Sequence, residues 1–415
     1  MIGTHLWELR RDGSVRKSGE LGCPGIRFAS TSLTLDTQDT AMVAAVVNTA
    51  AIDHCMIGGV RHDLQITDRV IVAADATLSP RWIARVKGQV SKPWGSKIVV
   101  ASSGTGDVFV AGAGERSGVT IGPKVIMPAT SGRDPRLWIA GLSGATGEFL
   151  WAQTGHGKNA AGTPLGSFTA ALVGHAGHGW LLSYYSKKII LAGTELVAPS
   201  PSCGDFLPLH GAIASFDAKL GSLSLLRPSA DTPDSGCRPA TTALAATPEG
   251  PCVAGAIRAA HVVGGVSIPM AGTNTAENPH ELFAACFDAT AQKARWTFHL
   301  GTTIPEKSVA LRTGQNGRLY LSAEIDQPIH VAGQTLWAPT GQPSFLLIVF
   351  DASSGTIVDA LVIPGLPAAQ TAFDVDRDGA ITLATRLLQP TTLGGRRIVP
   401  HVRGTLVIWR ITSGH

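Results

Sequence analysis

Short runs of alternating apolar and polar residues recur along most of the chain and are separated by turns of glycine and other small or polar residues. This alternation predicts β-strands, because successive side chains of a strand point to opposite faces of a sheet. The clearest element is a hairpin of two strands around a small or polar turn. Its six predicted copies span residues 41–59, 97–112, 168–184, 242–255, 309–323 and 372–385.

A short stretch with a Gly-Gly or Ala-Gly step follows most hairpins, and we interpret these stretches as crossings over the edge of a sheet. Examples are residues 190–193, 263–266 and 331–334. A strongly apolar third strand, a turn and a fourth strand come next. The copies begin at Leu137, Gly211, Leu282 and Phe345. The whole unit is about 65 residues long, within the range in which repeats build propellers or solenoids.

These units predict an all-β fold, a β-propeller of six four-stranded blades in a single domain, residues 1–415. Residues 1–22 are interpreted as closing strands, and the predicted blades are approximately 23–96, 97–157, 158–230, 231–301, 302–366 and 367–415. The last blade ends after a third strand, so we expect the N-terminal segment to complete it and remove exposed edges. One third-type strand is then in surplus. It could lie outside, pair with a partner, or belong to a seventh blade that uses residues 27–37.

Three of the third strands end in a Phe-Asp-Ala step, at Asp217, Asp288 and Asp351. An aspartate at the start of a type I turn accepts hydrogen bonds from the backbone amides that follow it. We therefore expect a local structural role for these carboxylates.

With these turns in view, the repeat resembles the bacterial SBBP-type β-propeller repeat family. Residues 109–112 (Phe-Val-Ala-Gly) and 319–321 (Leu-Tyr-Leu) are similar to its second strand, and residues 345–355 are similar to its last hairpin. The resemblance covers nearly the whole chain, and blade 1, with 48–54 at its turn, departs most. It implies a propeller fold with surface, secreted or assembly-associated roles, and it brings no catalytic residues with it.

Composition narrows the class of partner. The net charge is only +4 and the arginines are scattered, which argues against a surface that follows nucleic-acid phosphates. No apolar run reaches the roughly 18 residues of a membrane span. The first 22 residues lack the apolar core of a secretory signal, although six cysteines favour an oxidising compartment. The compartment stays open, with an extracellular, cell-surface or virion-associated location favoured.

Cysteine pairing is a better interpretation of the six cysteines than catalysis, because no motif supplies a histidine partner. Cys252 and Cys286 are expected on neighbouring strands of one blade, so we pair them. The other predicted disulfides join Cys203 to Cys237 and Cys23 to Cys55. Buried free thiols are the alternative for all six.

Two clusters could hold a metal. Asp374, Asp376 and Asp378 match the first half of a calcium loop, but Thr385 stands where an EF-hand has its bidentate glutamate. The motif also falls on a turn that other blades build without aspartates, so a plain turn is favoured and calcium is the one cofactor considered. His175 and His178, with Cys203 and His210 nearby, lack the spacing of a zinc motif, so we do not favour a metal there.

No nucleophile elbow, paired carboxylates or phosphate loop is present in the sequence. We expect the tryptophans to pack between blades rather than to stack on sugars. They include Trp82, Trp138, Trp151, Trp180, Trp296, Trp337 and Trp409. The longest loops, 198–209, 229–240 and 270–280, are the expected binding segments.

The leading hypothesis is a non-catalytic binding or structural module with protein partners and possibly a surface glycan, in a surface, secreted or virion-like assembly. A carbohydrate-binding lectin and a polysaccharide-acting propeller enzyme are the alternatives. Apolar residues gathered on an outer edge would favour assembly. Acidic and histidine side chains close together at a channel mouth would favour the enzyme.

Overall fold

The computed structural model divides the chain into two compact units, which are treated separately below. Unit 1 comprises Met1–Arg10 and Ser14–Arg227, and unit 2 comprises Arg11–Gly13 and Pro228–His415. The structure describes residues 5–9, 15–20, 26–35, 41–50, 54–57, 60–64, 69–75, 79–88, 98–114, 118–128, 136–158, 168–185, 188–191, 193–197, 210–217, 223–226, 229–230, 241–257, 261–268, 281–304, 308–314, 316–368, 371–375, 379–387, 391–393, 396–399 and 405–411. None of the described segments is a helix with the length and hydropathy needed to cross a membrane.

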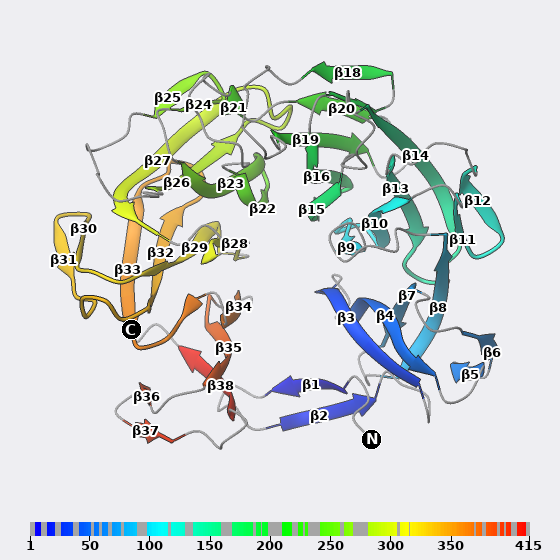
Figure 1. Cartoon of the computed structure of the whole chain (residues 1–415), viewed down its shortest axis with the longest axis horizontal. Coiled ribbons are helices and arrows are strands. Elements are labelled where there is room, and N and C mark those ends of the chain that lie inside the picture. The colour runs from blue at the N-terminus through cyan, green and yellow to red at the C-terminus, as the bar shows by residue number, and fades with distance from the viewer. Residues whose placement is uncertain are drawn as a thin grey trace. The chain divides into compact units, whose positions relative to one another are not determined.

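Unit 1 contains three four-stranded antiparallel meanders, which we call blades 1 to 3 (Figure 1). Their strands are β3 (Ile26–Leu35), β4 (Ala41–Ala50), β7 (Arg69–Ala74) and β8 (Pro80–Lys87); β9 (Val99–Ser102), β10 (Asp107–Gly114), β13 (Arg136–Ser143) and β14 (Phe149–Lys158); and β15 (Phe168–His175), β16 (His178–Tyr185), β19 (His210–Asp217) and β20 (Leu223–Leu226). A two-stranded sheet of β1 (His5–Leu9) and β2 (Val15–Glu20) precedes them.

Unit 2 repeats the pattern in blades 4 and 5 and in a three-stranded blade 6. Their strands are β22 (Thr241–Thr247), β23 (Gly250–Ile257), β26 (Glu281–Phe287) and β27 (Ala294–Thr303); β28 (Ala310–Thr313), β29 (Arg318–Ile325), β32 (Ser344–Asp351) and β33 (Ile357–Pro364); and β34 (Thr371–Val375), β35 (Ile381–Leu387) and β38 (Thr405–Ile411).

These repeated up-and-down sheets are the blades of a β-propeller, so the predicted all-β propeller fold is confirmed. Completion of the last blade by residues 1–22, and with it the number of blades, stays a prediction.

Between the second and third strands of every blade the chain forms a small hairpin, which we call a crossover hairpin. The six are β5 (His54–Ile57) with β6 (Val60–Asp63), β11 (Val119–Ile121) with β12 (Lys124–Met127), β17 (Lys188–Leu191) with β18 (Thr194–Val197), β24 (His261–Val263) with β25 (Val266–Ile268), β30 (Ile329–Val331) with β31 (Gln334–Leu336), and β36 (Thr391–Leu393) with β37 (Arg396–Ile398).

The Gly-Gly and Ala-Gly steps form the turns of these hairpins. Gly264 and Gly265 have φ values of 54° and 81°, and Ala332 and Gly333 have values of 50° and 78°. Two successive residues with positive φ make the turn whose twist suits a two-residue hairpin. The stretches that we predicted as simple crossings are therefore hairpins.

Blade 1 corrects the predicted repeat. Residues 41–50 form one strand, β4, which pairs along its length with β3. The predicted hairpin with its turn at 48–54 is therefore wrong, and residues 27–35 belong to the first strand of blade 1 rather than to a seventh blade. Asn48 resembled a turn signal, yet pairing with β3 carries the strand through it. The other five predicted hairpins coincide with the first two strands of blades 2 to 6.

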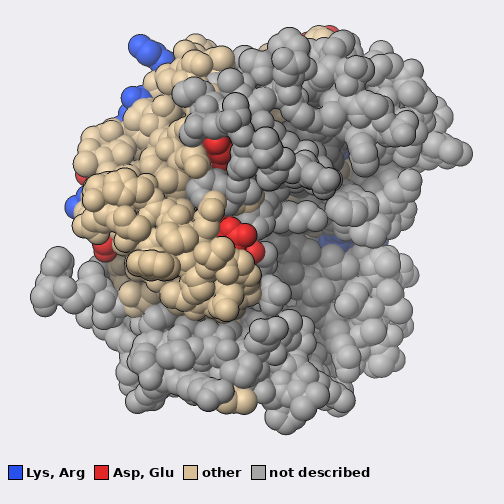
Figure 2. All heavy atoms as spheres, turned by 60° about the vertical axis from the view of Figure 1, so that its left-hand side comes forward, with Lys and Arg blue, Asp and Glu red and all other residues tan. Residues whose placement is uncertain are grey.

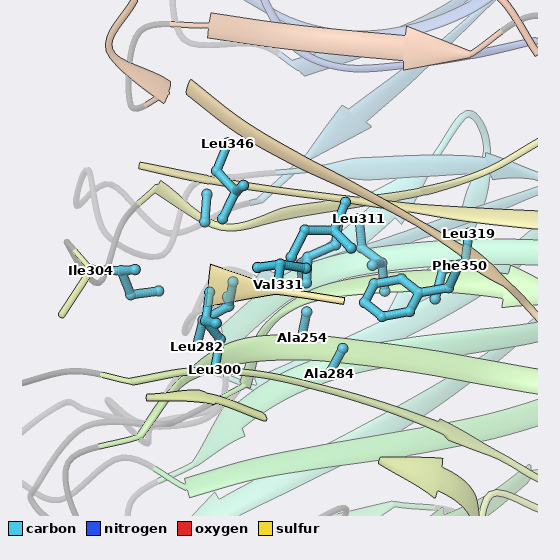
Figure 3. Packing of buried hydrophobic residues seen from close by; sticks show 14 of the residues in the cluster. Ala254, Leu282, Ala284, Leu300, Ile304, Leu311, Leu319, Val331, Leu346 and Phe350 are labelled. Carbon is cyan, nitrogen blue, oxygen red and sulfur yellow. The ribbon is translucent and has the colours of Figure 1, made fainter. Parts of the chain in front are cut away.

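The core lies between successive blades and is built mainly by their middle strands. All eight residues of β23 and all seven of β26 are buried. The apolar cluster of blade 4 continues into blade 5, where Leu282 and Ala284 join Leu311, Leu346 and Phe350 (Figure 3). Burial of apolar area contributes about 25 cal/mol per Å², so this continuity holds the two blades together.

Three tryptophans occupy one place in the repeat, near the start of the fourth strand. Trp82, Trp151 and Trp296 stand opposite small residues of the third strand. The indole N–H of Trp82 donates to the carbonyl of Gly144 at 2.9 Å, and that of Trp296 donates to Ala352 at 2.9 Å. In both cases the acceptor lies in the turn between the third and fourth strands of the next blade. These side chains pack between blades, as predicted.

Candidate functional site

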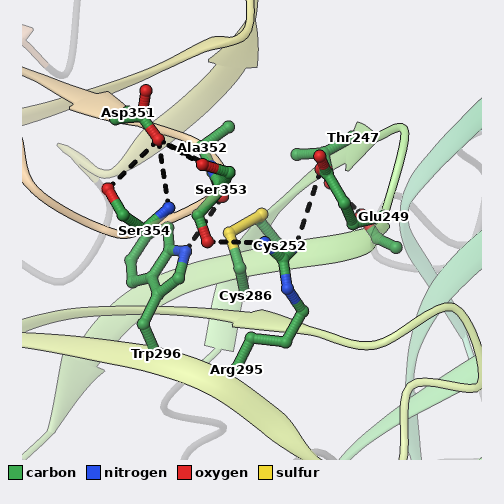
Figure 4. The surroundings of a disulfide bond; sticks show 11 residues. Thr247, Glu249, Cys252, Cys286, Arg295, Trp296, Asp351, Ala352, Ser353 and Ser354 are labelled. Atoms are coloured by element: carbon green, nitrogen blue, oxygen red, sulfur yellow. Dashed lines mark hydrogen bonds and ion pairs between the residues drawn. A yellow bond between two sulfur atoms is a disulfide. The ribbon is translucent and has the colours of Figure 1, made fainter.

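A disulfide joins the two middle strands of blade 4. Cys252 of β23 and Cys286 of β26 lie directly opposite each other, and both are completely buried (Figure 4). This is the pair predicted from the repeat. Cys203, Cys237 and Cys23 lie outside the described residues, and only the backbone of Cys55 is described, in β5. The other two disulfides stay predictions.

Next to the disulfide, blade 4 is fastened to the turn that connects β32 and β33 in blade 5 (Figure 4). Arg295 donates to the carbonyl of Ser353 at 2.6 Å and lies 3.5 Å from the carboxylate of Glu249. The ring of Trp296 stacks on Phe350 with centroids 5.5 Å apart. We call this group the blade 4–5 joint. Its polar groups bind one another and a backbone carbonyl, which suits a structural role.

The aspartate of this turn behaves as the sequence predicted. Oδ1 of Asp351 accepts hydrogen bonds from the hydroxyl groups of Ser353 and Ser354, at 2.6 and 3.1 Å, and from both of their backbone amides. These bonds, the one from the Ser353 hydroxyl first, lower the pKa of Asp351 from 3.8 to about 2.

Asp288 holds the matching turn of blade 4. Burial raises the pKa of its carboxyl, but hydrogen bonds from Thr290, Gln292 and Lys293 outweigh burial and lower the pKa overall. Both carboxylates therefore stay ionised as acceptors within a turn.

The predicted calcium turn is only partly described. Asp374 ends near Arg312, whose Nε lies 3.9 Å from its carboxylate, and its side chain is 75% exposed. A guanidinium already occupies one side of this carboxylate. Asp376 and Asp378 lie outside the described residues. Within the part of the chain that the structure describes, no three His, Cys, Asp or Glu side chains gather as metal ligands. Calcium binding stays a prediction.

The two histidines considered for a metal face each other across a tight turn. His175 and His178 are directly opposed, and the turn between them is Ala176-Gly177, with φ values of 48° and 84°. Both side chains are exposed. Cys203 lies outside the described residues, and of His210 only the backbone is described. The structure gives these histidines a turn to flank and brings no third ligand to them among the described residues.

Buried polar residues at the start of the third strands were not anticipated. Arg69, Arg136, Glu281 and Ser344 each begin a third strand, and each is buried. Arg136 donates to the carbonyl of Pro128, at the end of a crossover hairpin, at 2.6 Å. Burial lowers the pKa of both arginines. A polar residue before each apolar third strand was the sequence signal, and it was overlooked.

Glu281 is the buried carboxylate of this group. Its Oε2 lies 2.6 Å from Nε2 of His299, and the two side chains are 6% and 18% exposed. A buried carboxylate requires such a partner, since burial of an unpaired charge is costly. The pair satisfies itself within blade 4.

Seven large apolar side chains are exposed in the described part of the chain, and we call them the outer apolar set. They are Val125, Leu150 and Val197 in unit 1, and Val266, Trp337, Val358 and Val399 in unit 2. Five lie on or directly after the second strand of a crossover hairpin, and the other two follow the first residue of a fourth strand. Trp337 is 74% exposed, so for this residue the predicted role in packing is wrong.

Charged side chains are sparse around the members of this set in unit 2. On the face turned to the viewer in Figure 2, the Lys, Arg, Asp and Glu residues of the described surface are few and lie apart. The sequence did hold a signal for the set, since an apolar residue recurs four positions after the hairpin turn, as in Val197, Trp337 and Val399.

No protein-family model matches the sequence, and a comparison with curated proteins finds no relative. Several solved structures are similar at low identity. An α-L-arabinanase of Penicillium chrysogenum is 10% identical, over 87% of this chain and 89% of that one, with a TM-score of 0.41. The Dos1 propeller is 10% identical, over 91% and 78% of the two chains, with a TM-score of 0.38. A quinohemoprotein alcohol dehydrogenase of Comamonas testosteroni is 11% identical, over 93% and 73%, with a TM-score of 0.35. At such TM-scores none of them carries an activity or ligand over to this chain, whose fold class rests on its own sheets.

Proposed function

We propose that this chain is a non-catalytic β-propeller module that binds other proteins as a structural component of a larger assembly, at a cell surface, in secreted material or in a virion-like particle. The observation that carries the proposal is the position of the outer apolar set. Every member lies on a crossover hairpin or at the start of a fourth strand. Clustered exposed apolar side chains mark interaction sites more often than ordinary surface.

The kind of side chain supports the same conclusion. Trp337 is 74% exposed, although tryptophan is among the residues that contribute most when a partner covers them. Val125 and Val399 are each 68% exposed, also on crossover hairpins. Covering such groups removes apolar area from water, at about 25 cal/mol per Å².

The polar chemistry of the described blades also fits a scaffold. Asp288 and Asp351 are engaged as acceptors within turns, and Glu281 is paired with His299. Arg295 binds the neighbouring blade. These groups maintain the fold, so they lend no support to an enzyme.

The test is isolation of the tagged protein from its native source, followed by sedimentation. We expect the wild-type protein in a large particle. A variant with Val125, Val197, Trp337 and Val399 all changed to serine should sediment as free protein with an unchanged melting temperature. The matched control changes exposed polar residues of the same hairpins, Lys124, Glu195 and Gln334, to serine and should stay in the particle. A free wild-type monomer that hydrolyses a polysaccharide would contradict the proposal.

Carbohydrate binding is the second candidate, and Trp337 is the one observation in its favour. A sugar ring can stack on an exposed indole, and polar groups lie on the same hairpin, where His330 Nδ1 is 3.4 Å from the hydroxyl of Thr335. The test is calorimetric titration with a panel of oligosaccharides. Lectin activity predicts binding that Trp337→Ala removes and Trp337→Phe largely keeps, whereas a panel without any binding ligand rejects it.

A further inference from the structure

Within unit 1, strands of the same chain cover the outer edges of two blades. β8 of blade 1 pairs with β11, where Val86 and Lys87 stand opposite Ile121 and Thr120. β14 of blade 2 pairs with β17 from Gly155 onward. Each covering strand is short, antiparallel and largely apolar. The molecule therefore shows what kind of segment fits the edge of a fourth strand.

Blade 5 lacks such a cover in the described part of the chain. β33 pairs with β32 along its length and with no other described strand. Its sequence, IVDALVIP, contains one charged residue, whereas β8 contains Arg81, Arg85 and Lys87. An apolar strand with an open row of N–H and C=O groups is a template for pairing with another chain.

The register explains why a crossover hairpin does not cover β33. Trp151 of β14 stands opposite Gly141, and the covered segment begins four residues later, at Gly155. The residue of β33 that corresponds to Trp151 is Asp359, opposite Val349. The corresponding segment would therefore begin at Ile363 and continue into Pro364. Proline has no N–H to donate, so the same ladder cannot form there.

The N-terminal part of β33 is free of this obstacle. The N–H of Ala360 donates to Oδ1 of its neighbour Asp359 at 2.8 Å, so it points away from β32. Backbone groups alternate along a strand, so those of Val362 point outward as well. One carboxylate thus occupies an outward donor of this edge.

We infer that β33 is the edge through which two copies of this chain pair, antiparallel, around a two-fold axis at Leu361. This inference rests on the proposed function, since it names a second copy as one partner of the module. The axis sets Ala360 opposite Val362 of the second copy, so outward groups meet outward groups. It sets Asp359 opposite Ile363 of the second copy, so the two carboxylates do not face each other.

A second copy fits this edge because β33 itself has the character of the strands that cover β8 and β14, with β-branched apolar residues and one charge. Pairing would join two four-stranded sheets into one of eight strands. An edge of eight residues buries less than the roughly 1,200 Å² of a typical stable interface. The dimer is therefore weak and depends on protein concentration.

The experiment is sedimentation velocity of the purified full chain over a range of concentrations. Wild type should shift from monomer to dimer, and Ala360→Pro should weaken the dimer at least tenfold, because it removes an outward donor and leaves the bonds to β32 in place. Asp359→Ala should strengthen the dimer, because it releases the N–H of Ala360. A melting curve shows whether each variant is folded.

Val358→Lys provides a second route that does not change the backbone. Val358 is 48% exposed at the bulge that opens β33, and lysine there places two like charges near the paired edges. The matched control is Leu150→Lys, because Leu150 is also 48% exposed and occupies the same bulge in β14, whose edge β17 covers. Val358→Lys should weaken the dimer, and Leu150→Lys should leave it unchanged.

A protein that stays monomeric as wild type and as Asp359→Ala overturns the inference. So does a dimer that Val358→Lys leaves unaltered. Neither result affects the proposed function, whose test changes residues of the crossover hairpins and leaves β33 intact. Conversely, a dimer that responds as expected survives the absence of a native particle.

Discussion

Trp296 and Trp337 belong to successive blades of unit 2 and lie in opposite environments. Trp296 is half-buried, donates to the carbonyl of Ala352 and stacks on Phe350. Trp337 follows a crossover hairpin and is 74% exposed. The difference comes from the repeat, because a fourth strand faces the turn of the next blade and the end of a crossover hairpin does not. Position within the blade, more than residue type, decides what a tryptophan does here.

The largest expected effect is loss of the disulfide that lies opposite Trp296. Cys252 and Cys286 enclose a separation of 34 residues, and a cross-link of that size stabilises a protein by about 3 to 4 kcal/mol. We expect the double variant Cys252→Ala, Cys286→Ala to unfold at a correspondingly lower denaturant concentration. Reduction of the wild-type protein should match it, and equal unfolding midpoints before and after reduction would contradict this prediction.

Truncation of Trp296 should come next. Trp296→Ala removes the stacking on Phe350, the hydrogen bond to Ala352 and the packing against Gly355, and we expect a loss of about 3 kcal/mol in the free energy of unfolding. Trp82→Ala is the matched variant, because Trp82 makes the same bond to Gly144 in unit 1. A loss at Trp296 below about 1 kcal/mol would show that the blade 4–5 joint does not depend on the indole.

The turn that receives Trp296 should make stability depend on pH. The pKa of Asp351 is lowered from 3.8 to about 2 in the folded protein, so the carboxylate stabilises the fold above about pH 4 and this contribution disappears as the pH falls towards 2. We expect Asp351→Ala to melt below wild type at pH 7, with the gap closing between pH 4 and pH 2.

The variant Ser353→Ala, Ser354→Ala is the control for this effect. It keeps the carboxylate and removes the hydroxyl groups that bind it, at 2.6 and 3.1 Å. It should therefore lose part of the same dependence on pH. A gap between Asp351→Ala and wild type that stays constant down to pH 2 would contradict the role assigned to these bonds.

What the sequence predicted correctly depends on short-range physics or on the repeat. The turns at Asp288 and Asp351 are local, because the carboxylate binds amides within four residues. The disulfide was predictable because the second and third strands of a blade are neighbours in any copy. Blade 1 failed because Asn48 looks like a turn residue, and only pairing with β3 shows that the strand continues through it.

Exposure was harder to predict than pairing. The crossover hairpins have strands of three or four residues, too short for an alternation to be recognised, so their glycine steps were taken for crossings. Whether Trp296 or Trp337 is covered depends on a turn more than 50 residues away in the first case, as the Ala352 contact shows, and on the absence of one in the second. Composition and periodicity hold no record of such contacts.

The smallest expected effect on stability is at Trp337 itself. With 74% of the residue exposed, Trp337→Ser should change the free energy of unfolding by less than about 0.5 kcal/mol. Leu336→Ser is the control on the adjacent residue, because Leu336 is half-buried against the blade 4–5 core and should destabilise the protein measurably. Denaturant unfolding of the two variants side by side checks this. A loss above about 1 kcal/mol for Trp337→Ser would mean that the indole is covered within the isolated chain, which would remove the strongest member of the outer apolar set. A negligible loss would mean that the indole adds almost nothing to folding, so that its apolar area is available to a partner.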